Sequence, residues 1–164
     1  MFYFCSMGSN IDPAHNVCRT IESLADNVAP VTLSPLIQTA PHGMQSAQPF
    51  YNALFWFESS ENADMIKQRF NGIETSLGRN RNDPDKKTKD RPIDLDILYA
   101  GPARPLAELR VDDPYLSPLT PILSGKAPTA SVISLQFAGK RLGLGVLHIS
   151  RSGDGFRVER AALP

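Results

Sequence analysis

The chain has few of the residues that mark several large protein classes. Its 164 residues include two cysteines, Cys5 and Cys18, together with one tryptophan and three histidines. Two cysteines are too few for a disulfide framework, and we expect both to be reduced thiols of the core. No apolar run approaches the ~20 residues of a membrane span, and no basic region precedes an apolar stretch at the N-terminus. We therefore expect a cytoplasmic protein with no membrane partner.

Net charge of either sign is also missing. Lysine and arginine together number 17, and so do aspartate and glutamate. Domains that bind a long stretch of nucleic acid are usually basic, so no nucleic-acid partner is expected. The length and the 41% content of hydrophobic residues suit one globular domain over residues 1–164. Such a domain buries roughly 70% of the surface of its unfolded chain.

Apolar periodicity predicts strands and helices along the whole chain. We expect strands at 1–7, 31–38, 50–58, 93–99, 132–137, 145–150 and 156–161. We expect helices at 13–26 and 62–77, and loops at 40–49 and 101–121. The first helix has Asp12 as its N-cap with Pro13 behind it, and Gly78 ends the second. Pro35 marks an edge or a bulge, and residues 152–155 form a hairpin turn.

The order of these elements indicates the fold class. The first six follow the order strand, helix, strand, strand, helix, strand, which is the split βαβ arrangement of ferredoxin-like folds. The sequence thus predicts an α+β protein in which two helices cover one face of an antiparallel sheet. The other face would be open to loops and ligand, and the C-terminal strand and hairpin would extend the core fold.

The most informative segment is a basic loop followed by two aspartates. Residues 79–91 carry six basic and three acidic side chains, a local charge of +3. In the next strand, Asp94 and Asp96 alternate with apolar residues, so their carboxylates share one face and lie roughly 6–7 Å apart. Two partly buried anions raise each other's pKa, and Mg²⁺, which prefers carboxylates together with phosphates, removes that cost. The pattern indicates metal-dependent phosphoryl-type transfer; the alternatives are a solvated strand face and a solvated loop.

Several segments of the first 101 residues match one known family in order. They are Gly8-Ser9-Asn10, Thr39 to Gly43 with Gln45, Phe50 to Ala53, Ile73-Glu74, Gly78 to Arg81, and Arg91 to Leu98. With them the chain resembles 6-hydroxymethyl-7,8-dihydropterin pyrophosphokinases. The most specific part is Arg-x-x-Asp-Leu-Asp-Ile-Leu with Gly-Arg-x-Arg upstream.

The resemblance implies a reaction and its partners. The family transfers a pyrophosphoryl group from ATP to the hydroxymethyl oxygen of a reduced pterin and releases AMP, a step of folate biosynthesis. ATP and the pterin would be the partners, and two Mg²⁺ ions the cofactors. The chain would act as a monomer or weak dimer.

The resemblance also implies which residues form the site. Asp94 and Asp96 would hold the metal ions, and Arg79 and Arg91 would contact the phosphates, completing the catalytic set. Arg81 matches a more mobile position that would bind the nucleotide. The expected pterin-binding residues are Thr39, Gly43, Phe50 and Asn52.

Beyond residue 101 the chain departs from the family pattern. Asp113 stands at the expected nucleotide-site histidine, Leu119 at a phosphate-binding arginine and Pro121 at a second pterin-stacking aromatic. We expect Arg110 to replace a missing basic residue and Tyr115 to replace the missing ring, which places both in the cofactor-binding set with Arg81.

Several residues, and the chain as a whole, also fit other interpretations. Phe50 can be a core residue, His42 an exposed loop residue, and Asn10 a turn residue. Glu74 is expected to bind a loop backbone, and Asn52 needs partners if its amide is buried. The chain as a whole can be an active enzyme or a catalytically silent relative that binds a pterin-like ligand or a protein. A ferredoxin-like RNA binder is a third reading, which overall neutrality disfavours.

Overall fold

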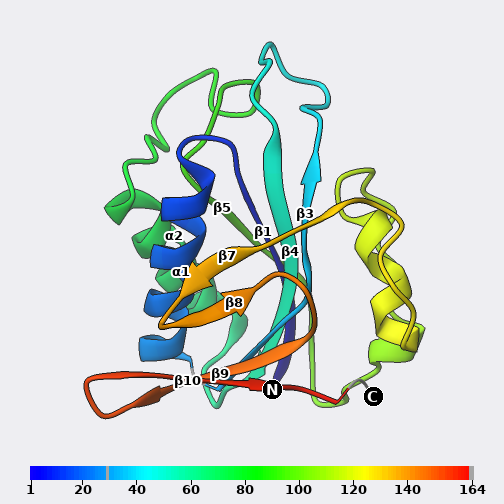
Figure 1. Ribbon diagram of the computed structural model, residues 1–164. Coiled ribbons are helices and arrows are strands. Elements are labelled where there is room, and N and C mark those ends of the chain that lie inside the picture. Colours follow the sequence, from blue (N-terminus) through cyan, green and yellow to red (C-terminus); the bar gives the residue numbers. More distant parts are fainter. Residues whose placement is uncertain (29, 163–164) are drawn as a thin grey trace.

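The computed structural model describes residues 1–28 and 30–162, and an antiparallel sheet forms its centre (Figure 1). Its first five strands are β1 (Phe2–Ser9), β2 (Val31–Leu33), β3 (Leu36–Thr39), β4 (Phe50–Glu58) and β5 (Asp94–Gly101). The central order is β2-β4-β1-β5, with β3 also paired to β4 and every pair antiparallel. Helices α1 (Pro13–Asn27) and α2 (Ala63–Ser76) lie on one face. This arrangement confirms the predicted α+β, ferredoxin-like class.

The C-terminal part enlarges the sheet. Its strands are β6 (Val132–Ile133), β7 (Leu135–Phe137), β8 (Lys140–Leu142), β9 (Leu147–Ser152) and β10 (Gly155–Arg160). β9 pairs with β2 and forms a hairpin with β10, and β6 pairs with β3. β7 and β8 form a separate two-stranded sheet. The hairpin turn predicted at residues 152–155 is confirmed, but the strand predicted at 132–137 is divided between two sheets.

The helix ends follow local signals, with one exception. The side chain of Asn62 accepts a hydrogen bond from the Met65 N–H at 3.0 Å and caps α2. Gly78 has a φ of 97°, the left-handed conformation that follows many helices. The prediction that Asp12 caps α1 through its side chain is wrong. Asp12 precedes the helix, but it adopts a left-handed backbone, and its side chain makes no capping hydrogen bond.

Two strands differ in length from the sequence prediction. β1 continues through Ser9 because Gly8, expected to end it, pairs with Asn52 of β4 on one side and Asp94 of β5 on the other. The strand expected at 31–38 breaks at Ser34-Pro35, where Ser34 exchanges backbone and side-chain hydrogen bonds with Leu54. The break agrees with the irregularity expected from Pro35.

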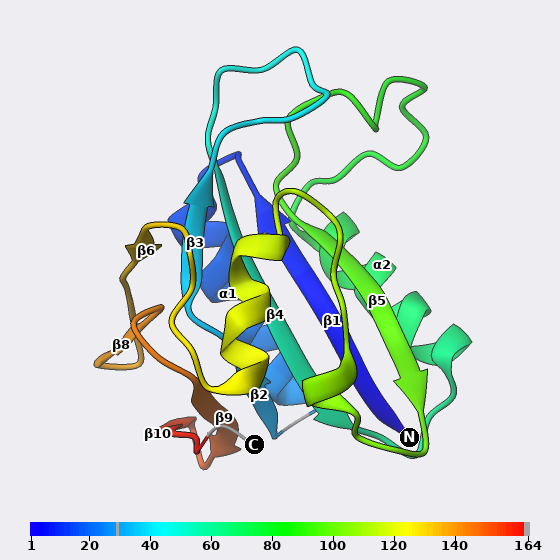
Figure 2. The same ribbon diagram turned by 90° about the vertical axis from the view of Figure 1, so that its right-hand side faces the viewer.

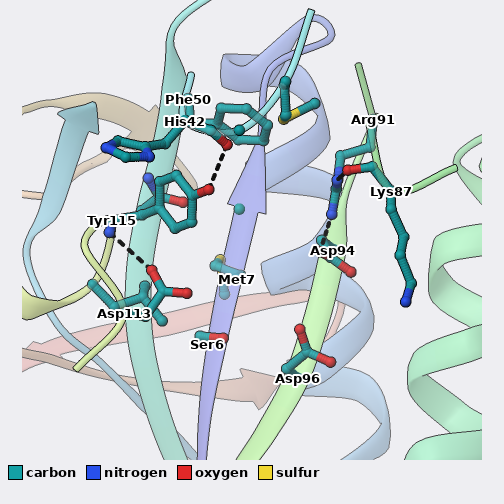
Figure 3. Close-up of a pocket in the computed structure, with 15 residues that line it drawn as sticks. Ser6, Met7, His42, Phe50, Lys87, Arg91, Asp94, Asp96, Asp113 and Tyr115 are labelled. Carbon is teal, nitrogen blue, oxygen red and sulfur yellow. Dashed lines mark hydrogen bonds and ion pairs between the residues drawn. The ribbon is translucent and has the colours of Figure 1, made fainter. Parts of the chain in front are cut away.

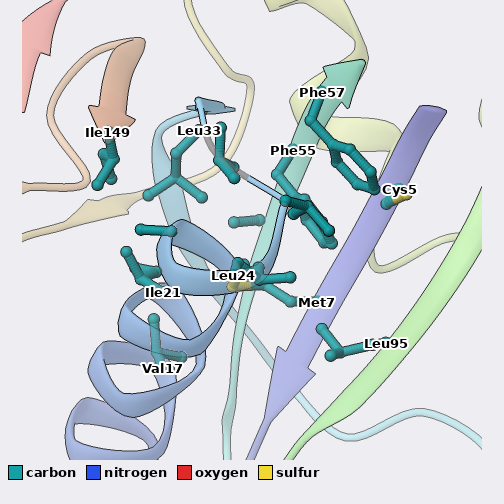
Figure 4. Close-up of a cluster of buried hydrophobic side chains, with 14 of the residues drawn as sticks. Cys5, Met7, Val17, Ile21, Leu24, Leu33, Phe55, Phe57, Leu95 and Ile149 are labelled. Atoms are coloured by element: carbon teal, nitrogen blue, oxygen red, sulfur yellow. The ribbon is translucent and has the colours of Figure 1, made fainter. Parts of the chain in front are cut away.

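Apolar layers cover both faces of the central strands. On the helical side, Cys5, Met7 and Phe55 belong to one cluster with Leu24 and other side chains of α1 (Figure 4). The same cluster includes Phe70 of α2. On the other side, Trp56 belongs to a second cluster with residues of the 3₁₀ helix η2 (Ser117–Ser124), which lies across β4 and β1 in Figure 2. A shorter 3₁₀ helix, η1 (Leu106–Glu108), precedes it. The face that we expected to be open is therefore covered along part of its length.

The two cysteines and the helices can be compared with what composition led us to expect. Cys5 is buried and Cys18 is half-buried, and both are free thiols. Among the described residues, no helix combines the length and the apolar character needed to cross a membrane.

Candidate active site

A pocket of about 310 Å³ lies where β1, β4 and β5 meet the loop at 40–49 and the segment at 113–116 (Figure 3). Its lining residues are Ser6, Met7, Gly8, His42, Gly43, Met44, Phe50, Asn52, Lys87, Arg91, Asp94, Asp96, Asp113, Tyr115 and Leu116. Polar groups thus stand on the strand side and the loop side of one cavity. This combination suits a ligand with both a flat ring and a charged chain.

Gly8 and Asn52 form a tightly packed part of the pocket. A Cβ atom on Gly8 would lie 2.7 Å from Oδ1 of Asn52, so only glycine fits without displacing that amide. The Asn52 Nδ2 donates a hydrogen bond to Thr39 Oγ1 at 2.7 Å. The Asn52 amide is therefore held in one orientation between two neighbouring strands. Phe50, at the start of β4, places its mostly buried ring beside it.

Asp94 and Asp96 stand on the opposite wall of the pocket, on β5 (Figure 3). Arg91 Nη1 donates to Asp94 Oδ2 at 2.5 Å, and Arg79 Nη1 binds Asp94 Oδ1. Burial by itself would raise the pKa of Asp94, but the hydrogen bonds and charge of Arg79 and Arg91 outweigh it and lower that pKa. The more exposed Asp96 pairs with Lys67 of α2 at 3.2 Å. Each carboxylate is therefore paired with at least one cationic side chain.

Glu74 joins the end of α2 to the wall of the pocket that β5 forms. Its carboxylate is fully buried and accepts the Leu95 N–H at 2.8 Å. It also pairs with Arg79 at 3.1 Å and with Arg81. Burial raises the pKa of Glu74, although the Leu95 hydrogen bond and the charges of Arg79 and Arg81 oppose that rise. Leu95 lies between the two aspartates, so Glu74 fixes the backbone that carries them and the arginines that neutralise them.

The buried side chain of Asn10 anchors the far end of the basic loop. Its Oδ1 accepts the Arg91 N–H at 2.8 Å, and its Nδ2 donates to Asp90 Oδ1 at 2.7 Å. The backbone N–H groups of Asn10 and Ile11 also donate to the Arg91 carbonyl oxygen. The backbone of Arg91 is therefore held in place, although most of the preceding loop is exposed.

Tyr115 closes the pocket on the side opposite the aspartates. Its hydroxyl donates to the carbonyl oxygen of His42 at 2.5 Å, and the two rings meet edge to face with centroids 5.7 Å apart. The Tyr115 N–H donates to Asp113 Oδ1 at 2.8 Å. Two loops that are 73 residues apart in sequence are thus connected over the cavity.

The structure brings most of the predicted site residues together. Of the set predicted from sequence, the pocket is lined by Gly43, Phe50, Asn52, Arg91, Asp94, Asp96 and Tyr115. Arg79, Arg81 and Thr39 stand behind it, where they hold Asp94, Glu74 and Asn52.

Arg110 lies outside this pocket. Its guanidinium donates to the carbonyl oxygens of Ala107 and Leu109, and it lines a separate depression beside η2. The structure thus gives no contact between Arg110 and the other candidate residues, because the chain turns away from β5 at η1.

Two residues that hold the site together carried no such signal in the sequence. Lys67 is one of several polar residues of α2, and its contact with Asp96 spans 29 residues. Asn10 was assigned only a role in a turn, because its partners lie 80 residues away. The Asn10 contact lies at the end of the β1–β5 pair, and the Lys67 contact depends on the packing of α2 against β5.

The carboxylates of the pocket fit one kind of metal ion. Within residues 1–28 and 30–162, no cluster of three or more His, Cys, Asp or Glu side chains could enclose a metal. Asp94 and Asp96 supply carboxylate oxygens from one wall of an open pocket. Such a pair fits Mg²⁺, which commonly takes one or two protein carboxylates and completes its shell with water and substrate phosphates.

Comparison with known proteins identifies relatives of the chain. Residues 4–124 match the family model described as 7,8-dihydro-6-hydroxymethylpterin-pyrophosphokinase. A 2-amino-4-hydroxy-6-hydroxymethyldihydropteridine pyrophosphokinase from Porphyromonas gingivalis strain ATCC 33277 is 32% identical over 143 residues, which cover 79% of this chain and 97% of the relative. The protein of the same name from strain W83 gives the same identity and coverage. The family match continues past residue 101, where the resemblance of the motifs ends.

Proposed function

The chain belongs to the 7,8-dihydro-6-hydroxymethylpterin-pyrophosphokinase family, and from this premise we propose that Asp94 and Asp96 hold the Mg²⁺ needed for its reaction. The reaction is the transfer of pyrophosphate from ATP to hydroxymethyldihydropterin in folate biosynthesis. The observation that carries the assignment is that both aspartates line the same cavity as Phe50, Asn52 and Arg91. A ring-binding wall and an anion-binding wall thus face one another across one pocket.

The ATP end of the site is the wall formed by β5 and the basic loop. Mg²⁺ bound by Asp94 and Asp96 supplies charge neutralisation for the transferring group. Arg91 reaches the pocket itself, and Arg79 stands next to it on the shared partner Asp94. Guanidinium groups match phosphate oxygens in paired hydrogen bonds, so these arginines bind the polyphosphate, with Arg81 adding charge from behind.

The pterin end of the site lies between β4 and the loop at 40–49. Asn52 offers an amide to the polar edge of the ring, and Thr39 fixes its orientation through the 2.7 Å hydrogen bond. Phe50 stacks on the ring face, which adds about 0.5–1.5 kcal/mol beyond the buried area. Tyr115 closes the pocket and contributes the second ring, and the backbone around Gly43 completes the wall.

The protein promotes the transfer by holding ATP and the pterin in alignment. The hydroxymethyl oxygen forms a bond to the β-phosphorus while the bond from that phosphorus to the bridging oxygen of the α-phosphate breaks, and AMP leaves. Phosphoryl transfer needs alignment and charge stabilisation more than it needs covalent participation by the protein. The residues of β4 hold the acceptor, and those of β5 hold the donor. The antiparallel pairing of both strands with β1 fixes the relation between the two walls.

Further properties complete the proposal. We propose that two Mg²⁺ ions act together, since two carboxylates and a polyphosphate provide ligands for both. We also propose that residues 1–164 function as a single cytoplasmic domain, as a monomer or a weak dimer. Size-exclusion chromatography with light scattering measures the last property directly.

The direct test is AMP formation from ATP and 6-hydroxymethyl-7,8-dihydropterin in the presence of Mg²⁺. We expect Asp96→Ala to abolish turnover and to leave the melting temperature close to that of the wild type, because Asp96 is exposed. Asp154→Asn, on the exposed turn of the β9–β10 hairpin, is the matched control and should retain full activity. Full activity of Asp96→Ala would refute the metal assignment.

A separate binding measurement tests the ATP end. A non-hydrolysable ATP analogue with Mg²⁺, at a hundred times its dissociation constant, should stabilise the wild type by about 2.7 kcal/mol. The Asp96→Ala protein should show a much smaller gain at the same concentrations.

A further inference from the structure

Lys67 stands beside the metal-binding wall although it does not line the pocket. It extends from α2, and its Nζ donates to the Leu95 carbonyl oxygen at 2.9 Å and to Asp96 Oδ1 at 3.2 Å. Asp94 is compensated by two arginines that the proposed function assigns to phosphate. The partner of Asp96 is a lysine of α2, which has no role in phosphate binding in the proposed function.

We propose that Lys67 determines how tightly Asp96 binds a divalent cation, by competing with that cation for the carboxylate. This inference rests on the proposed role of Asp96 in holding Mg²⁺. A metal ion must either share Asp96 with the ammonium or displace it from Oδ1. In both cases the positive charge of Lys67 opposes the positive charge of the metal, and the protein requires a higher metal concentration.

The position of the ammonium does not depend on Asp96 alone. The Leu95 carbonyl oxygen gives it a second acceptor, so Lys67 can release Asp96 and remain next to it. Its helix is also fixed, because the neighbouring Ile66 and Phe70 are fully buried in the core. The Lys67 ammonium therefore keeps a fixed position next to Asp96, whereas the lysines of residues 79–91 lie on an exposed loop.

The expected size of the effect follows from Coulomb's law. A metal on Asp96 and the Lys67 ammonium would be about 5 Å apart, and unit and double charges at that distance in water at 0.1 M salt change a dissociation constant by about fivefold. Loss of the ammonium should therefore tighten metal binding by about that factor. A role limited to connecting α2 with β5 would change thermal stability and leave the metal affinity constant.

The test is a titration of the full chain with Mn²⁺, in which the free ion is measured by electron paramagnetic resonance and Mg²⁺ is added as a competitor. Lys67→Met removes the charge and keeps the length of the stem, and it should bind Mn²⁺ about fivefold more tightly than the wild type. Lys67→Arg should restore the wild-type affinity. Lys140→Met, in the exposed strand β8, changes the net charge equally and should bind as the wild type does.

The outcomes separate this inference from the function on which it rests. Equal or weaker Mn²⁺ binding by Lys67→Met, or the same tightening in Lys140→Met, would overturn the role of Lys67. The absence of measurable Mn²⁺ binding by Lys67→Met at millimolar concentration would do the same. Asp96→Asn should lose affinity; if it binds Mn²⁺ as tightly as the wild type, the metal role of Asp96 itself is wrong.

Discussion

Replacement of Glu74 by glutamine retains the shape of the side chain and removes its charge. In the wild type this fully buried carboxylate accepts the Leu95 N–H at 2.8 Å and neutralises Arg79 and Arg81. The amide of glutamine can still accept the Leu95 hydrogen bond. It cannot compensate the two guanidinium groups, so Glu74→Gln isolates the electrostatic part of the contact.

The magnitude follows from the burial of each partner. Removal of one member of a buried ion pair commonly costs about 3–5 kcal/mol. The Arg81 side chain is 37% exposed and can be solvated in the variant, whereas Arg79 is only 12% exposed and retains Asp94. The charged carboxylate of Glu74 is desolvated by burial, which raises its pKa; the neutral amide avoids this desolvation cost, and that offsets part of the loss. We therefore expect a loss of about 2 kcal/mol for Glu74→Gln.

The assay is thermal unfolding followed by the fluorescence of Trp56, which is buried in the second apolar cluster. For a chain of this size, a loss of about 2 kcal/mol should lower the melting temperature by about 4–8 °C. Glu61→Gln is the matched control, because Glu61 pairs with Arg69 near the surface, and it should cause a much smaller change. A melting temperature of Glu74→Gln within 1 °C of the wild type (about 0.3 kcal/mol) would refute this account of the network.

Three further predictions concern the two walls of the pocket. The pKa of Asp94 lies below its ordinary value of 3.8, so its charge stabilises the fold above that pH, and the contribution is lost as pH falls through the folded-state pKa. In urea titrations the stability advantage of the wild type over Asp94→Asn should shrink between about pH 5 and pH 2; a constant difference would contradict the shift. Gly8→Ala should displace the Asn52 amide and weaken pterin binding at least about tenfold in calorimetry, with ATP affinity unchanged. Tyr115→Phe removes the hydroxyl that binds the His42 carbonyl oxygen, worth about 0.5–1.5 kcal/mol, and should weaken pterin binding about twofold to tenfold; equal affinity would exclude a closing role.

Local sequence signals were sufficient for the elements that carry the site. The aromatic segment at 50–58 forms β4 with the predicted bounds, and Gly78 ends α2 as expected. The alternation around Asp94 and Asp96 also holds, since Ile93 and Leu95 are fully buried while the aspartates face the pocket. These features depend on residues that are neighbours in sequence, and one strand or helix is enough to decide them.

The features that sequence reasoning missed depend on distant contacts. Residues 101–121 were expected to be loop, but the 3₁₀ helix η2 begins at Ser117, and its residues Leu119, Ile122 and Leu123 belong to the same apolar cluster as Trp56. The left-handed backbone of Asp12 and the Lys67 contact with Asp96 were also missed. The Lys67 contact has no local pattern, because it is decided by how α2 packs against β5.

The placement of β5 at the end of the sheet has a consequence for solubility. One side of this strand pairs with β1, and the other side would present free peptide groups to a strand of another molecule. At Leu95 both peptide groups are already bound by side chains of α2, the N–H by Glu74 and the carbonyl oxygen by Lys67. The two side chains next to the aspartates thus occupy both peptide groups of Leu95, which an added strand would need for pairing at this edge.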